Sequence, residues 1–330
     1  MLNTQEYLCQ SPMRLDLFLS QMIGQTRSQV ATLIKKGCVM VDTKIVNRPG
    51  VKLKENQRIS IEFPELQEIT KNVSLEGLSW VDTIEILYED DDVLVINKPS
   101  GVTVHPAPSV KEATLVDWLK YKGIRLSTIS GEERHGIVHR LDKGTSGAMV
   151  VAKNNDAHQK LSEQLQDKSM GRYYLAVVTP PLKDDVTIIE SNIGRSSHNR
   201  LKMACGLEHG KYAKTMFKYL ALSNDEKAQL IACKLFTGRT HQIRVHLESI
   251  NRHILGDHIY AQSPKIEKAE HILLHAYILY FIHPHTQEKM TFQAPIDNYM
   301  QEKIEKKFDL EKIDEVLTPQ YITNSFTTIL

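Results

Sequence analysis

Several features that would narrow the function are missing from this sequence. No apolar run approaches the roughly 18 residues that a helix needs to span a bilayer, and the polar start MLNTQEYLCQS lacks the apolar core of a signal peptide. The four cysteines, Cys9, Cys38, Cys205 and Cys233, lie far apart and form no CxxC pair. Such cysteines are typical of free thiols in a reducing compartment. We therefore expect a cytoplasmic protein that makes no contact with a membrane.

Signatures of nucleotide-binding and repeat folds are also missing. The sequence has no GxGxxG motif, no regular alternation of strands and helices, and no internal repeat of fixed period. This favours an α+β fold over a doubly wound one. The 330 residues suggest about two domains, and 41% hydrophobic and 25% charged residues are ordinary for a globular protein with a real core.

The net charge of the chain is small, but positive charge is unevenly distributed along it. The formal net charge is only +1, yet residues 13–60 contain nine Lys or Arg and three acids, a surplus of six positive charges. Such asymmetry indicates a basic module joined to a near-neutral domain. The simpler interpretation is a solvated basic domain with no partner, and charge alone does not exclude it.

The basic module has helical and then extended patterns. MRLDLFLSQM and RSQVATLIKK each place apolar residues on one helix face, while CVMVDTKIV and RISIEF are typical of short strands. The order of residues resembles the alpha-L RNA-binding domain, which implies that the second helix and its basic end rest on structured RNA. The residues expected to contact RNA are Arg14, Arg27, Ser28, Lys35 and Lys36.

The rest of the chain predicts a second, larger domain. A polar and acidic stretch with little periodicity follows the module, and then come two expected strands, Ile84–Tyr88 and Val93–Asn97, around an acidic turn. We expect a mixed, largely antiparallel sheet with flanking helices. The expected regions are an RNA-binding domain over 13–63, a linker over 64–79, a catalytic domain over 80–300, and a C-terminal helix and tail over 301–330.

Three stretches could carry chemistry. HRLDKGTSG presents one carboxylate, Asp142, on a turn with two glycines, although an isolated aspartate in a loop more often only accepts backbone hydrogen bonds. KLFTGRTHQIRVHLE predicts a helix that Thr237 or Thr240 could cap, with Arg244 on it; a surface pair between Arg244 and Glu248 is the simpler interpretation. GRYYLAVV is typical of a strand with two tyrosines.

Together these stretches resemble the motifs of RluA-type pseudouridine synthases. HRLDxxTSG combined with TGRTHQIRVH is highly specific to that family. Two departures are Gly144, where an acid is common, and Arg172, where lysine is common. The motifs, in chain order, are NKPSGVTVHP (97–106), HGIVHRLDKGTSG (135–147), RYYLAVV (172–178) and LFTGRTHQIRVHL (235–247).

The resemblance implies an isomerase that detaches uracil from its ribose, rotates it and rejoins it through carbon-5, without cofactor or metal. Asp142 matches the catalytic aspartate, and Arg244 the basic residue that pairs with it. Tyr174 matches the tyrosine that stacks on the base, while Ile243 would line the base pocket. The target nucleotide must leave its stack to be reached, and Arg140 matches the arginine that takes its place.

The implied partner is large-subunit ribosomal RNA or a pre-ribosomal particle, bound by a monomer. Two alternatives remain open: a transfer-RNA pseudouridine synthase, and a non-catalytic protein that only binds ribosomal RNA. Two histidine pairs, His135 with His139 and His271 with His275, have a spacing of four. Neither has a third ligand nearby, so we predict no metal site.

Overall fold

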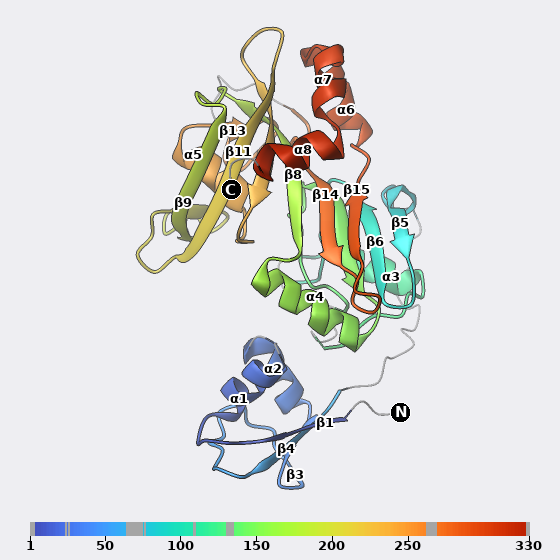
Figure 1. The fold of residues 1–330 in the computed structure, drawn as a ribbon, viewed down its shortest axis with the longest axis vertical. Helices are drawn as coiled ribbons and strands as arrows, with labels where there is room; N and C mark the ends of the chain where they lie inside the picture. Colours follow the sequence, from blue (N-terminus) through green and yellow to red (C-terminus); the bar gives the residue numbers. More distant parts are fainter. Residues whose placement is uncertain are drawn as a thin grey trace.

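The fold contains two separate sheets (Figure 1). The computed structural model describes residues 4–23, 25, 27–63, 75, 77–107, 110–129, 135–261 and 269–327, without the side chains of 28 and 29. Most of the expected linker over 64–79 and the side chain of Ser28 therefore lie outside the described residues. Across the described chain, every helix is too short or too polar to cross a bilayer.

The N-terminal unit is a small sheet packed against two helices. Its core includes Leu15, Leu19, Leu33 and Ile34, which are fully or almost fully buried, as the helical spacing predicts. The first strand was not expected, because only its last two residues, Tyr7 and Leu8, are apolar. The elements are β1 (Thr4–Leu8), α1 (Leu15–Met22), α2 (Arg27–Lys35), β2 (Val39–Val41), β3 (Lys44–Ile45) and β4 (Arg58–Glu62), with strand order β1-β4-β2-β3.

The large sheet has eleven strands, and its main path runs β10-β9-β11-β12-β8-β14-β7-β6-β5. Two further strands pair off this path, β13 with β8 and β15 with β14. The strands are β5 (Glu85–Glu89), β6 (Val93–Lys98), β7 (Ser146–Ala152), β8 (Gly171–Thr179), β9 (Val186–Arg195), β10 (Met203–Cys205), β11 (Lys211–Leu222), β12 (Gln229–Leu235), β13 (His253–Ile254), β14 (Leu274–Ile282) and β15 (Lys289–Gln293).

Strand pairing in this sheet is antiparallel except between β14 and β7, among the strands that the structure describes. The parallel pair sets His275 opposite Ser146 and Ala276 opposite Gly147. A short 3-10 turn, η1 (Val81–Thr83), precedes β5. The mixed, largely antiparallel sheet with flanking helices confirms the expected α+β class.

Helices cover both faces of the large sheet. They are α3 (Leu115–Tyr121), α4 (Asn155–Asp167), α5 (Gln242–Ser249), α6 (Asn298–Lys307), α7 (Leu310–Val316) and α8 (Pro319–Thr327). Because side chains alternate along a strand, β8 faces two cores. Tyr174 and Ala176 join the core that includes residues of α3 and α5, whereas Tyr173 and Leu175 join the core beneath α6, α7 and α8.

The C-terminal region packs more fully than the sequence indicated. A helix followed by a tail was expected, but α6 and α7 are followed by a third helix, α8, whose Ile322 and Phe326 are fully buried. Phe326 lies 5.3 Å from Tyr173 between ring centroids. The expectation of a tail was therefore wrong. Little in the sequence indicated α8, because only two of its apolar residues are buried and the β8 residues of the same core lie far away in the sequence.

A side chain of the large domain packs into the core of the N-terminal unit. Ile129, which follows α3 in the large domain, belongs to the core cluster of the N-terminal unit and is 3% exposed. In Figure 1 the N-terminal sheet (blue) lies beyond α4, at the opposite end of the molecule from α6 and α7 (red). An apolar contact therefore helps to fasten the basic module to the large domain.

The burial of α8 leads to the first prediction. Phe326→Ala should lower the free energy of unfolding by about 3–5 kcal/mol, because it removes a fully buried aromatic ring from the core. Tyr321→Ala, on the exposed side of the same helix, should change it by no more than about 0.5 kcal/mol. Urea unfolding measures both. Equal effects of the two variants would mean that α8 does not pack on β8.

Candidate functional site

Asp142 lies on a tight turn immediately before β7. The N–H of Thr145 donates to the carbonyl of Asp142 at 3.0 Å, which closes the turn. Gly147 has φ of +114°, and a Cβ there would lie 2.3 Å from the carbonyl oxygen of Ala276. A Cβ on Gly144 would lie 2.8 Å from the side chain of Ile272. The glycines thus let the turn lie against β14.

The NKPSG loop holds this turn from the other side. The Nζ of Lys98 donates to the carbonyls of Pro99 and Val102 at 2.8 and 2.9 Å, and to that of Lys143 at 3.4 Å. The N–H of Gly101 also donates to the carbonyl of Lys143, at 2.9 Å. Burial lowers the pKa of Lys98 to about 7, although the Asp142 carboxylate acts in the opposite direction. No role for this lysine was predicted from the sequence.

Arg244 contacts two carboxylates at once. Its Nε and Nη2 donate to the two oxygens of Asp257 at 2.7 and 2.8 Å, and its Nη1 donates to Oδ2 of Asp142 at 3.2 Å. The simpler interpretation, a surface pair between Arg244 and Glu248, is wrong: Arg244 is 8% exposed, and Glu248 pairs with Lys202. The structure therefore brings Asp142 and Arg244 together, with Asp257 as an unexpected third member.

The charges of this group are stabilised inside the protein. Burial would raise the pKa of Asp257, but the hydrogen bonds and charge of Arg244 and the amides of Tyr260 and Ile259 lower it. Likewise, burial disfavours the charged form of Arg244, but its bonds to Asp257 and the charges of Asp257 and Asp142 raise its pKa. Asp257 and Arg244 are therefore both ionised at neutral pH. The Nη1 of Arg244, which does not bond Asp257, is left to donate to Asp142.

The start of α5 differs from the expected cap. The residue before the helix is His241, which has φ of +56° and makes no side-chain cap bond. Thr237 instead accepts from the N–H of Lys214 and donates to the side chain of Gln242. The left-handed backbone turns His241 inward: its Nε2 lies 3.9 Å from Oδ2 of Asp142, and its Nδ1 lies 2.9 Å from the hydroxyl of Tyr260. Burial lowers the pKa of His241.

The remaining predicted residues border the same space. Tyr174 is 4% exposed, and burial raises the pKa of its hydroxyl. Ile243 is equally buried, on α5 beside Arg244. Arg140 is exposed, and its Nη1 lies 3.3 Å from Nε2 of His105. All three line one cavity of about 570 Å³ together with Asp142 and Arg244.

The lining of this cavity is strongly cationic. Asp142 is its one carboxylate among the described residues, against six arginine or lysine side chains. These are Arg140, Lys168, Arg172, Lys234, Arg239 and Arg244. Such a cavity favours an anionic ligand and places a single carboxylate within it.

The basic residues of the N-terminal unit do not line the cavity. Arg14 and Arg27 are about half exposed, and each donates to the buried Asp16 at 2.9 Å. The bonds from Arg14 and Arg27 hold the pKa of Asp16 well below its usual range. Lys35 and Lys36 are exposed at the end of α2. The two arginines are thus partly neutralised, which was not predicted from the sequence.

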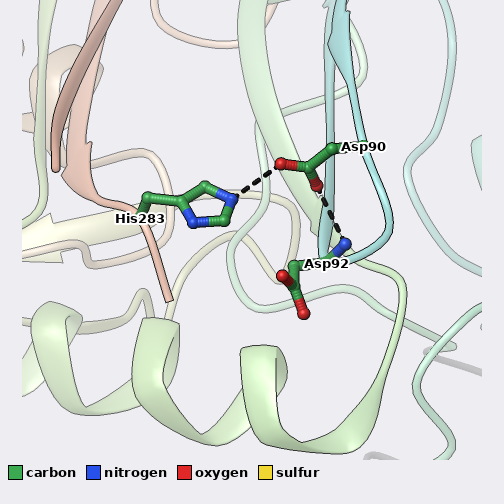
Figure 2. Close-up of side chains that lie close together, drawn as sticks. All are labelled: Asp90, Asp92 and His283. Carbon is green, nitrogen blue, oxygen red and sulfur yellow. Dashed lines mark hydrogen bonds and ion pairs between the residues drawn. The ribbon is translucent and has the colours of Figure 1, made fainter. Parts of the chain in front are cut away.

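Asp90, Asp92 and His283 could in principle hold a metal ion, because their ligand atoms lie within 4.8 Å of one another (Figure 2). The Nδ1 of His283 accepts two backbone N–H bonds, so Nε2 carries the proton and donates to Asp90 at 2.8 Å. Asp92 accepts from Asn154. The bond between His283 and Asp90 connects the turn after β14 to the turn after β5.

The geometry can be compared with known proteins. Residues 92–249 match the family model described as RNA pseudouridylate synthase, and residues 13–59 match the S4 domain. A Helicobacter pylori protein named as an uncharacterized RNA pseudouridine synthase is 45% identical over 95% of both chains. A Zymomonas mobilis protein named ribosomal large subunit pseudouridine synthase D is 38% identical over 87% of this chain and 92% of its own.

Solved structures agree with the fold. The structure titled Human RNA Pseudouridylate Synthase Domain Containing 1 covers 72% of this chain and 97% of its own, with a TM-score of 0.57 and 24% identity. At that identity the likeness concerns the fold alone. The two proteins therefore share a fold over most of this chain.

The buried pair of Arg244 and Asp257 gives the second prediction. Asp257→Asn should lower the free energy of unfolding by about 3 kcal/mol at pH 7, because it leaves a buried guanidinium without its main counter-charge. The exposed acid Asp185, paired with Lys218, is the control; Asp185→Asn should cost less than about 1 kcal/mol. Urea unfolding of both variants makes the comparison.

The same variant has a defined pH dependence. The pKa of Asp257 is lowered in the folded state, so its contribution is present above the unfolded value of about 3.9 and is lost as the pH falls through the folded value. The difference between the wild type and Asp257→Asn should therefore be full at neutral pH and smaller at about pH 3. A difference that grows on acidification would contradict the assignment.

Proposed function

The chain belongs to the RNA pseudouridylate synthase family, and we propose that it converts uridine to pseudouridine in large-subunit ribosomal RNA. Proteins of this family are isomerases that act on RNA. Relatives named as large-subunit synthases and the N-terminal S4 domain support the choice of RNA. The observation that carries the proposal is the carboxylate of Asp142, held by Arg244 beside Tyr174 in a cationic cavity.

Asp142 is proposed as the group that attacks the nucleotide or removes a proton from it. Its side chain is 20% exposed and lies within the cavity. Because Asp257 takes the two-pronged contact with Arg244, Asp142 receives a single bond at 3.2 Å. A carboxylate that accepts a single, long hydrogen bond keeps lone pairs available for reaction.

The other cavity residues are proposed to bind the base. The uridine leaves its stack and enters the cavity, where the ring of Tyr174 gives a flat surface for stacking and Ile243 gives an apolar wall. Arg140 is exposed at the cavity, as a residue that replaces the flipped nucleotide must be. No step of this proposal requires a metal or a cofactor.

We propose that residues 13–63 bind RNA, that 64–79 link them to a catalytic domain over 80–300, and that 301–330 complete its rear face. Lys35 and Lys36 are exposed at the end of α2 and would contact phosphate, with Arg14, Arg27 and Ser28 at the border of that contact. The chain would act as a cytoplasmic monomer on ribosomal RNA or a pre-ribosomal particle.

The catalytic role of Asp142 is tested by Asp142→Asn. Pseudouridine formation in large-subunit ribosomal RNA should fall below detection, while RNA affinity should stay equal or rise slightly, because a negative charge leaves a cationic cavity. Pseudouridine mapping and a binding titration give the two values. Asp185→Asn is the control and should leave both unchanged. Wild-type turnover in Asp142→Asn would remove Asp142 from its role.

The role of the basic module is tested by a double variant, Lys35→Gln with Lys36→Gln. The plot of log affinity against log salt should become less steep by about 0.7–0.9 for each phosphate that the variant no longer binds. Lys306→Gln with Lys312→Gln, on exposed positions of α6 and α7, should leave the slope unchanged. Equal slopes for both double variants would mean that the end of α2 does not contact RNA.

A further inference from the structure

Arg172 is a buried cation of the cavity that no part of the proposed chemistry uses. It follows Gly171 on β8 and shares a face of the strand with Tyr174, whose ring centroid lies 6.0 Å from its Cζ. The side chain is 9% exposed, and its Nε has no hydrogen-bond partner. Among the described residues no carboxylate forms an ion pair with it, although a buried guanidinium is strongly favoured by one.

The neighbour of Arg172 does not supply the missing negative charge. Its Nη1 contacts Nδ1 of His139, whereas Nε2 of that histidine faces the N–H of Val150 at 3.1 Å. A neutral imidazole has one acceptor nitrogen, so it cannot accept from both donors. Burial and the charge of Arg172 lower the pKa of His139 well below its usual value, so the ring is neutral and brings no counter-charge.

Two lysines line the same cavity as Arg172. Lys168 ends α4 in a left-handed conformation and is exposed, and Lys234 projects from β12 over the rings of Tyr173 and Phe236 at 5.5 and 5.4 Å. Both line the cavity, and neither forms an ion pair with a described residue. The cavity therefore has three cations, Arg172, Lys168 and Lys234, that form no ion pair with a described residue, whereas Arg244 is paired with Asp142 and Asp257.

We propose that Arg172, with Lys168 and Lys234, binds a phosphate of the RNA strand next to the nucleotide that reaches Asp142. The proposal rests on the proposed function for the identity of the ligand. The Cζ of Arg172 lies 6.0 Å from the ring centroid of Tyr174, so the backbone of a nucleotide stacked on that ring would lie close to Arg172. A guanidinium can donate two parallel bonds to a phosphate, and the Nε of Arg172 is a buried donor with no hydrogen-bond partner.

The test compares charge removal on the protein with charge removal on the RNA. The protein is the full chain with Asp142→Asn, so that RNA binds without reacting. The ligand is the large-subunit ribosomal RNA fragment that this protein binds most tightly, made with one uncharged methylphosphonate linkage at each position in turn. Dissociation constants are measured for each RNA with Asp142→Asn alone and with Asp142→Asn plus Arg172→Gln.

The expected result is coupling at one linkage. Neutralising that linkage should weaken binding by about tenfold to the first protein and by no more than about twofold to the Arg172→Gln protein, because the latter has no guanidinium to bind the phosphate. Arg172→Lys should retain part of the coupling, since the charge remains although the two parallel donors are lost. Lys289→Gln, on an exposed position of β15 outside the cavity, should leave the full tenfold effect.

The opposite result would overturn the proposal. If each linkage has the same fold effect in both proteins, Arg172 meets no phosphate and only packs against Tyr174 and His139. Should Arg172→Gln fail to fold, the same comparison with Lys234→Gln decides, because Lys234 is less buried. Since the readout is binding without turnover, absence of pseudouridine formation by the wild type would refute the proposed function and leave this result standing.

Discussion

The site depends on one buried arginine that serves two carboxylates. Arg244 gives its two-pronged contact to Asp257 and its remaining nitrogen to Asp142. Without Asp257, the full charge of Arg244 would fall on Asp142 and bind it closely. With Asp257 in place, the arginine is fixed in position, and Asp142 is oriented while remaining partly exposed. Asp257 therefore neutralises the buried charge of Arg244, while Asp142 is held by one bond and stays partly exposed to the cavity.

The turn that carries Asp142 is held in place by residues outside it as well as by its own side chains. Side chains of the turn bond to the rest of the domain: the hydroxyl of Ser146 donates to Asp297 at 2.8 Å, and Lys143 pairs with Glu112. The NKPSG loop also holds the turn, through Lys98 and Gly101, and both bond to the carbonyl of Lys143. Two motifs that lie far apart in the sequence are thus bonded to each other beneath the side chain of Asp142.

Local patterns predicted most elements, whereas partners distant in the sequence escaped prediction. Helical spacing located α1 and α2, and apolar runs located β6 and β8, because these signals lie within a few residues. The motifs brought Asp142, Tyr174 and Arg244 into one cavity, as the family resemblance implied. Asp257 was missed although an acid between Ile254-Leu255 and Ile259-Tyr260 is unusual. Burial of that acid makes sense only once Arg244, on the preceding helix, is seen to point at it.

The rear face of β8 has a consequence for how the protein is made. Tyr174 faces the cavity, but its neighbour Tyr173 packs against Phe326 of α8, so the strand that carries Tyr174 is covered late in synthesis. At about 5–20 residues per second, roughly 8–30 s separate the emergence of the two partners from the ribosome. During that interval the nascent chain exposes an apolar strand face. The sheet that carries the cavity is therefore enclosed on its rear side only after the ribosome has translated all of α8.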